Sequence, residues 1–290
     1  MSHSSLDDPS RERCWDINGL KLSGLSWGDP DGRPLLMLHG WLDNAASFSL
    51  LAPLLDQYHV IALDLTGQGH SSHRSADANY HIWDDLPEIM GVVEQLGWDS
   101  FDLLGHSRGA IISTLLASAY PERIKRLVLL DAIIPEPVTE AAFPAQLRMF
   151  LDQKPALLDA DNSVYESLAA ATIIRKRIGL TNIAAQLISE RGLVDCPDGV
   201  TWRTDRRLQG ASAVKLTTGQ TRAVLDGLTM PTLLLLAEGG RMTSAAIIAT
   251  LDGHPTLQLE YVVGGHHFHL EPPLDTLVSQ ISRFLGESNR

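Results

Sequence analysis

The chain has 290 residues and a formal net charge of −12 at pH 7, and its composition is 44% hydrophobic and 20% charged. This length suits one large α/β core, with or without an inserted subdomain, and the apolar content is ordinary for a globular protein. The acidic excess argues against non-specific binding to nucleic acid or to an anionic membrane surface.

Signals for secretion or membrane insertion are absent from the sequence. Residues 1–13 are polar and charged without an apolar core, and we expect them to form a flexible N-terminus. No uninterrupted apolar stretch reaches the roughly 18 residues of a membrane span. Cys14 and Cys196 are the only cysteines, which suits a reducing compartment. We therefore expect a cytoplasmic protein.

The first expected elements are a β-hairpin followed by strands that alternate with helices. Asn18-Gly19, a pair typical of a two-residue turn, separates residues 15–17 from 21–23. Apolar residues between Ile82 and Leu96 keep helical spacing, and Gly97 ends that run. Short apolar runs that end at Gly, Asp or Pro predict parallel strands buried on both faces. These runs are residues 35–38, 60–63, 101–104, 127–130, 232–236 and 257–263.

The alternation of strand and helix stops between residues 135 and 219. This stretch has helix-like pieces near 145–151, 163–177 and 181–191 and no convincing strand. We therefore predict an α/β fold with a doubly wound, mostly parallel sheet and an inserted helical cap. The expected core comprises residues 14–134 and 220–290, and the expected cap comprises 135–219. The basic run 175–177 is expected to be a solvated helix end within the cap.

Residues 105–109 read GHSRG and lie between a predicted strand and an apolar predicted helix. A serine at such a tight turn is exposed above the sheet edge, and the helix N-terminus directs free N–H groups towards negative charge beside it. Ser107 is therefore the predicted nucleophile. The alternative is a buried structural turn.

A second loop, with the sequence His39-Gly40-Trp41, follows the strand at 35–38. A loop in this position supplies one N–H group of an oxyanion hole. We expect the backbone N–H groups of Trp41 and Arg108 to be the two donors, and the side chains of Trp41 and His106 to line the pocket. His39 is expected to be a structural histidine that holds the loop.

Three histidines follow the last predicted strand, in the run GGHHFHLEP at residues 264–272. His266 comes directly after a strand-end glycine and is the expected general base, while His267 and His269 are expected to be structural or to line the pocket. Three histidines in four residues also suggest a metal site, since imidazole is a common ligand. No acidic or cysteine cluster has ligand spacing, so we expect no metal.

Together these motifs resemble an α/β-hydrolase-fold serine hydrolase. The likeness rests on the 39–41 loop, the DLTGQGHS turn at 64–71, the 105–109 turn and the 265–272 histidine loop. The run HGWLDNAASF at 39–48 is more particular, and is similar to the subgroup called serine hydrolase-like proteins. In the 64–71 turn, Asp64 is expected to be structural, and Gly67 and Gly69 serve turns with positive φ.

The third member of the triad is less obvious, because the sequence departs from the family pattern. An aspartate usually follows the strand here placed at 232–236, but this chain has Gly240 near that position. Two replacements are available, Glu238 in the same loop and Asp131 at the end of the strand at 127–130. Some relatives on this fold carry their acid at the latter strand end, so Asp131 is preferred. The alternatives are Glu238 as the acid and Asp131 as a simple helix or turn cap.

The resemblance implies two-step acyl transfer to Ser107, with a small-molecule ester, thioester or lactone as substrate. No cofactor is expected, because the 64–71 turn lacks the third glycine of a dinucleotide fingerprint. No nucleic-acid or membrane partner is expected either, and the pattern indicates no oligomeric state. One alternative is a cofactor-free lyase or carbon–carbon bond hydrolase with the same triad. Another is a ligand-binding protein that retains the fold with little turnover.

Overall fold

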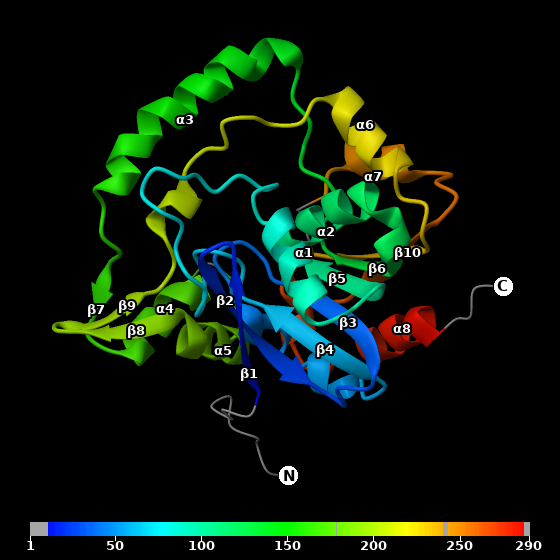
Figure 1. The fold of residues 1–290 in the computed structure, drawn as a ribbon, viewed down its shortest axis with the longest axis horizontal. Coiled ribbons are helices and arrows are strands. Elements are labelled where there is room, and N and C mark those ends of the chain that lie inside the picture. Colours follow the sequence, from blue (N-terminus) through cyan, green and yellow to red (C-terminus); the bar gives the residue numbers. More distant parts are fainter. Residues whose placement is uncertain (1–10, 178, 240–242, 287–290) are drawn as a thin grey trace.

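The computed structural model describes residues 11–177, 179–239 and 243–286, and at its centre lies an eight-stranded sheet (Figure 1). The strand order is β1-β2-β4-β3-β5-β6-β10-β11. The strands are β1 (Glu12–Ile17), β2 (Leu20–Trp27), β3 (Arg33–Leu38), β4 (Tyr58–Leu63), β5 (Phe101–His106), β6 (Ile124–Leu130), β10 (Thr232–Ala237) and β11 (Leu257–Val262).

Six neighbouring strands of this sheet, β4-β3-β5-β6-β10-β11, are parallel. Strand β2 pairs antiparallel with both β1 and β4. The β1–β2 hairpin turns at Asn18 and Gly19, both with positive φ, as the sequence predicted. Each apolar run expected as a strand lies in this sheet, although β11 ends one residue earlier than expected, at Val262. The parallel strands therefore bring their carboxyl ends to one edge.

Helices cover both faces of the sheet, and the side chains of each strand point alternately towards one helical layer and the other. Leu36 and Leu38 of β3 belong to the core cluster under α1, α2, α6 and α7, whereas Leu35 and Met37 belong to the cluster under α8. This division follows from the two-residue period of a strand. The helices are α1 (Leu86–Gln95), α2 (Arg108–Ala119), α6 (Thr218–Asp226), α7 (Ala245–Leu251) and α8 (Asp275–Gly286).

Helix α1 is shorter than the sequence pattern predicted. It begins at Leu86 rather than near Ile82, and Pro87 lies in its first turn. Proline has no N–H group and clashes with the preceding turn, so it is tolerated at the start of a helix but not in its interior. None of the helices in the described part of the chain has the length and apolar character needed to cross a lipid bilayer.

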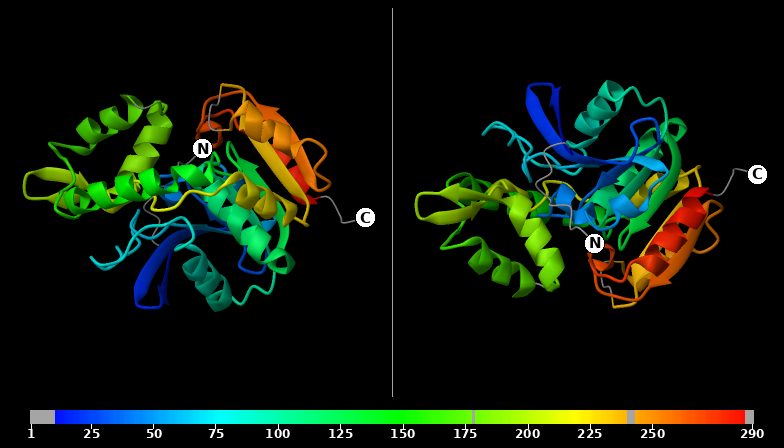
Figure 2. Two further views of the ribbon diagram at one scale, coloured as in Figure 1. Left: turned by 90° about the horizontal axis from the view of Figure 1, so that it is seen from above. Right: turned by 90° about the horizontal axis from the view of Figure 1, so that it is seen from below.

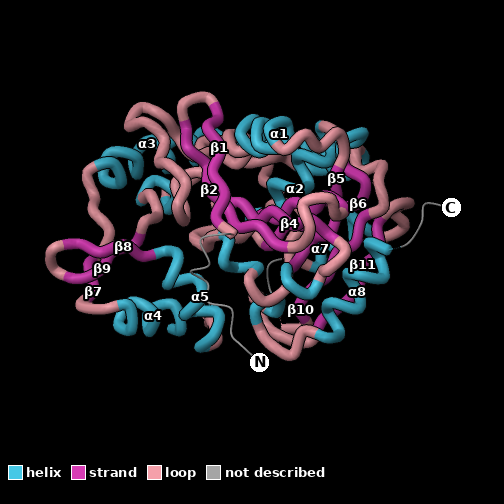
Figure 3. Tube along the Cα trace, turned by 60° about the horizontal axis from the view of Figure 1, so that its bottom comes forward, coloured by secondary structure: helices cyan, strands magenta, loops and turns pink. Residues whose placement is uncertain are grey.

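The described residues of 135–219, here named the cap segment, form the α-helices α3, α4 and α5 and a small antiparallel sheet of order β7-β9-β8. In Figure 2 these elements lie together on the side opposite α8, and Figure 3 shows the small sheet apart from the central strands. The described residues of the cap segment add no strand to the large sheet. The elements are α3 (Phe143–Leu158), β7 (Val164–Tyr165), α4 (Leu168–Arg177), α5 (Asn182–Gly192), β8 (Leu193–Cys196) and β9 (Gly199–Trp202).

Three sequence expectations about this organisation need correction. The small sheet was not expected, because strands of two to four residues are too short to show an alternating pattern. The helix expected over 163–177 is divided between β7 and α4. Strand β1 begins at Glu12 and helix α6 begins at Thr218, and each start is two residues earlier than the limit expected for the core. Residues 1–10 of the expected flexible N-terminus lie outside the described residues.

A buried ion cluster joins the cap segment to the sheet. The Arg191 guanidinium of α5 lies 2.7 Å from an Asp64 carboxylate oxygen and 2.8 Å from Glu12 of β1. Asp64 is completely buried and also accepts the backbone N–H groups of Ala45 and His70, at 2.7 and 2.8 Å. Burial alone would raise the pKa of Glu12, but hydrogen bonds from His70 and Arg191 lower it to about 2. These contacts give Asp64 a structural position.

Replacing Arg191 with leucine is expected to lower the free energy of unfolding by about 3–5 kcal/mol, because the buried Asp64 carboxylate loses its cationic partner. Urea denaturation followed by circular dichroism measures this change. Arg148→Ala is the control, since its pair with Asp152 is exposed and such pairs contribute about 0.5 kcal/mol. Equal effects of the two substitutions would contradict the structural role of the Arg191 cluster.

Candidate functional site

The site lies at the carboxyl ends of the central parallel strands. Ser107 stands between β5 and α2, with φ 52° and ψ −117°. A Cβ atom on Gly105 would lie 2.5 Å from the carbonyl oxygen of Gly109, and one on Gly109 would lie 2.1 Å from that of Leu38. Both positions therefore require glycine, and the tight turn that results places Ser107 at the sheet edge.

Ser107, His266 and Asp131 form a continuous hydrogen-bonded chain. His266 Nε2 lies 3.0 Å from Ser107 Oγ, and His266 Nδ1 lies 2.7 Å from Asp131 Oδ2. The other carboxylate oxygen of Asp131 accepts the backbone N–H of Ala237 at 2.9 Å. Because a carboxylate only accepts, His266 Nδ1 donates to it and Nε2 is free to accept the serine proton. The arrangement can deprotonate a serine hydroxyl.

Of the two acids considered from the sequence, the structure brings Asp131 to His266. Asp131 follows β6, is 1% exposed and has φ 56°, a conformation that aspartate tolerates better than most residues. Glu238 follows β10 with an exposed side chain, and its carboxylate has no contact with His266 within the described residues. Gly240, near the position where the family that the sequence resembles carries its acid, lies outside the described residues.

Two backbone N–H groups that the sequence analysis assigned to an oxyanion hole make no hydrogen bond within the described residues. They belong to Trp41 and Arg108. Arg108 is the first residue of α2, where backbone N–H groups lack an acceptor in the preceding turn.

The loop of residues 39–44 is held in place by its neighbours. His39 Nδ1 donates to the carbonyl of Gly40 at 2.8 Å, and His39 Nε2 accepts the backbone N–H of Leu65 at 3.0 Å. Leu42 has φ 59°, unusual for a leucine, and its N–H donates to Gln68 Oε1 at 2.7 Å. His39 therefore occupies a structural position, and Gln68 is a supporting residue that the sequence analysis missed.

The side chain of Trp41 connects this loop to the cap segment. Its indole N–H donates to the carbonyl of Leu208 at 2.8 Å, and the side chain is 48% exposed. Such an exposed aromatic side chain is not ordinary core. Trp41 thus links the loop to the cap segment, and its assignment as a pocket wall stays a prediction.

His106 differs from the expectation that it lines the pocket, since it has no exposed surface. Its Nε2 donates to the backbone carbonyl of His266 at 2.8 Å, so it ties the 105–109 turn to the histidine loop. Burial and the neighbouring His269, His267 and His266 lower its pKa well below the usual value. A neutral His106 therefore positions the loop that carries His266.

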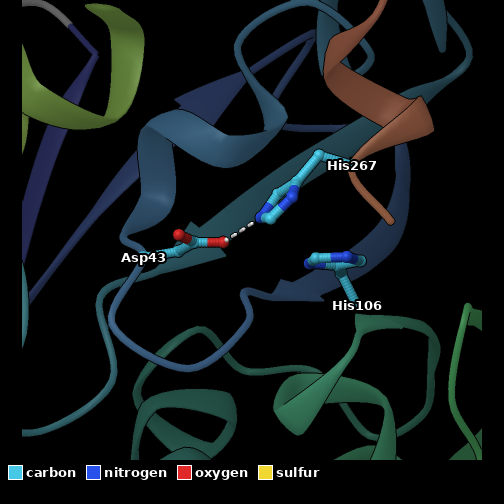
Figure 4. A group of neighbouring side chains, drawn as sticks. All are labelled: Asp43, His106 and His267. Atoms are coloured by element: carbon cyan, nitrogen blue, oxygen red, sulfur yellow. Dashed lines mark hydrogen bonds and ion pairs between the residues drawn. The ribbon is translucent and has the colours of Figure 1, made fainter. Parts of the chain in front are cut away.

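Asp43, His106 and His267 form a second polar cluster (Figure 4). The ring centroids of His106 and His267 lie 4.7 and 5.0 Å from that of His266 in the triad. One ligand atom of each lies within 4.8 Å of the others, the kind of grouping that could hold a metal ion. Asp43 Oδ2 already accepts His267 Nε2 at 3.2 Å, and Arg175 lies 3.9 Å from the other oxygen. Burial acts to raise the pKa of Asp43, but His267 and Arg175 outweigh it and lower that pKa. The cluster therefore binds the 39–44 loop to the histidine loop through an ionised carboxylate.

Arg175 contradicts the prediction that residues 175–177 form a solvated helix end. It is only 8% exposed, donates to the carbonyl of Leu42 and lies over the Trp202 ring at 4.9 Å. Lys176 and Arg177 are exposed, as predicted. The one signal in the sequence was the four-residue spacing between Arg175 and the buried Ala171, which places both on one face of α4.

We expect stability to fall as the pH drops below about 6.5, the unfolded pKa of histidine. Burial lowers the pKa of His39, His106 and His269, so the unfolded chain binds more protons. Their contribution to the free energy of unfolding is complete above the unfolded pKa of histidine. It is lost as the pH falls towards their lowered folded pKa values, by about 1.4 kcal/mol per pH unit for each histidine that stays neutral. Burial raises the pKa of Asp102 to about 6, which acts in the opposite sense.

Urea unfolding at pH 7.5, 6.5 and 5.5 of the wild type and His269→Gln separates these contributions, because Asp102 is common to both proteins. The free energy of unfolding of the variant should depend less steeply on pH than that of the wild type. Parallel pH dependences would show that His269 is not held neutral.

Comparisons with known proteins identify the fold family and similar proteins. The family model described as alpha/beta hydrolase fold matches residues 33–273. A serine hydrolase-like protein of Danio rerio is 28% identical over 91% of this chain and 85% of its own length. The 2-(acetamidomethylene)succinate hydrolase of Mesorhizobium japonicum is 27% identical over 98% of this chain and 99% of its own. A hypothetical protein from Pseudomonas aeruginosa PAO1 has a crystal structure that is similar with TM-score 0.89 and 40% identity, over 95% of this chain and 98% of that one.

Proposed function

The chain belongs to the α/β-hydrolase-fold family, and on this premise we propose that it hydrolyses a small carboxylic ester, thioester or lactone through an acyl-enzyme. Its similarity to serine hydrolase-like proteins supports a hydrolase that uses a serine. The observation that carries the proposal is the chain of contacts from Ser107 Oγ through His266 to Asp131, at 3.0 and 2.7 Å.

In the proposed mechanism, neutral His266 accepts the Ser107 proton as Oγ attacks the substrate carbonyl. Asp131 holds the imidazole in the tautomer that accepts at Nε2 and stabilises the imidazolium that forms. The N–H groups of Trp41 and Arg108 receive the developing oxyanion. His266 then donates its proton to the leaving group, and water repeats the sequence on the acyl-enzyme.

The environment of each group supports its proposed role. Ser107 is only 6% exposed, and Asp131 is almost entirely enclosed, so the ion pair that forms with His266 is little screened by water.

Two free cysteines, Cys14 and Cys196, suit a reducing compartment, and we place the protein in the cytoplasm as part of the same proposal.

A panel of p-nitrophenyl esters with graded acyl chains, together with a thioester and a lactone, tests the proposed reaction. We expect hydrolysis of at least one of them with kcat/KM above about 10⁴ M⁻¹s⁻¹, the lower end of the range for natural substrates. Initial rates followed by nitrophenolate absorbance or by pH-stat give the ranking. Absence of turnover across the panel would contradict esterase activity.

A second candidate function is hydrolysis of a different bond by the same triad. The Mesorhizobium relative is named for hydrolysis of an acetamidomethylene succinate, which is not an ester. A cofactor-free lyase or carbon–carbon bond hydrolase belongs to this alternative. A protein of this kind would label at Ser107 with a fluorophosphonate yet leave simple esters unhydrolysed, whereas a binding protein with a misaligned triad would label poorly.

A further inference from the structure

A cavity of about 230 Å³ lies where the cap segment meets the 39–44 loop. Its walls include Leu42 of that loop, Arg175 of α4, Trp202 of β9 and Arg206. Pockets that hold a whole small ligand usually enclose about 300–1,000 Å³. This cavity therefore suits one end of a substrate rather than an entire molecule.

The charge of the cavity is opposite to that of the whole chain. Two arginines and no carboxylate lie among its lining residues, although the chain carries a net charge of −12. The other polar lining groups are uncharged and include Asn162, Ser163 and Gln209. A guanidinium pair in a neutral polar wall favours a carboxylate or phosphate, both of which accept paired N–H groups.

Arg206 has no acceptor among the residues that the structure describes. Its Nε atom is buried without a hydrogen-bond partner, and the guanidinium has no ion pair within the described residues. Asp205 lies next to it in the chain but is already held by Arg207 at 2.6 Å and by the Tyr80 hydroxyl at 2.8 Å. A buried donor without an acceptor costs free energy, which an anionic ligand would recover.

Arg175 is only partly neutralised. Its nearest carboxylate is Asp43, at 3.9 Å, and Asp43 also accepts His267 at 3.2 Å. Arg175 lines the cavity, and its guanidinium is held by the carbonyl of Leu42 and by the Trp202 ring. This side chain is therefore ordered before a ligand arrives.

We propose that this cavity binds an anionic group of the substrate, a carboxylate or phosphate, with Arg206 and Arg175 as its cationic partners. The inference rests on the proposed function, since it assigns the substrate class of that hydrolase. Leu42 is the residue after Trp41, and neighbouring Cα atoms lie about 3.8 Å apart. An anionic end held here would contact the residue next to Trp41, whose N–H group is proposed to receive the oxyanion.

Two esters with five acyl carbons test this inference: p-nitrophenyl monoglutarate, which ends in a carboxylate, and neutral p-nitrophenyl pentanoate. The wild type should prefer the glutarate by about 10- to 100-fold in kcat/KM, as expected for hydrogen bonds to a charged group. Arg206→Gln should reduce this ratio at least tenfold. The ratio is compared within each protein, so a general loss of activity cancels.

Lys176→Gln is the matched control, because Lys176 is an exposed cation next to Arg175 on the same helix. It should leave the ratio unchanged. Inhibition by glutarate and by inorganic phosphate distinguishes the two anions, since the better fit inhibits at lower concentration. A wild-type preference for the neutral ester, or an equal ratio in Arg206→Gln and the wild type, would overturn the inference.

Binding measured without turnover separates this inference from the proposed function. If the wild type hydrolyses neither of these esters nor any other compound of the panel, the esterase proposal fails, and calorimetric titration of Ser107→Ala with glutarate and phosphate then decides the anion site. Binding of either anion that weakens at least tenfold in Ser107→Ala/Arg206→Gln supports the site. No binding, or equal binding by the two proteins, contradicts it.

Discussion

Replacing Ser107 with alanine is expected to lower kcat for the best ester of the panel by at least about 10³-fold while the fold is retained. The substitution removes the Oγ atom that lies 3.0 Å from His266 Nε2. The backbone N–H groups and the bound substrate alone leave a small residual rate. Initial-rate kinetics with purified protein and circular dichroism measure both parts of this expectation.

Ser118→Ala is the control for the serine substitution, because Ser118 lies at the far end of the same helix, α2. Its kcat should stay within about twofold of the wild type, since substitutions remote from a site have small effects. Retention of more than about a tenth of the activity by Ser107→Ala, with a native spectrum, would point to another nucleophile.

Asp131→Asn is expected to lower kcat by up to about 10⁴-fold with little change of shape. The asparagine amide can donate to His266 Nδ1, and the imidazole then carries its proton on Nε2, where it cannot accept from Ser107. Glu238→Gln, the matched substitution of the other candidate acid, should reduce kcat less than about tenfold, because the Glu238 side chain is exposed. The opposite order of the two effects would assign the acid to Glu238.

The central sheet was predictable because its strands leave a direct trace in the sequence. Parallel strands buried on both faces need continuous apolar runs, and the runs at 35–38, 101–104 and 127–130 lie in β3, β5 and β6. The 105–109 turn was predictable for a similar reason, since close packing of β5 against α2 admits only glycine at Gly105 and Gly109.

Contacts between distant segments left no such trace. Arg175 reaches the 39–44 loop across more than 130 residues of sequence, and its basic neighbours made the run look like a solvated surface. His106 looked accessible because it adjoins Ser107, yet alternate side chains at the end of β5 point in opposite directions, and this one is covered by the histidine loop. Asp131 could be placed at a strand end, but its distance from His266 depends on the packing of β6 beside β10.

The most direct test of a serine hydrolase mechanism is the site of covalent labelling by a fluorophosphonate, identified by tandem mass spectrometry of the digested protein. A single phosphonyl adduct on Ser107, formed much more slowly in His266→Gln, is the predicted result, because the reagent needs a serine activated by its base. An adduct on a different residue, or no adduct in a preparation that hydrolyses esters, would contradict the mechanism.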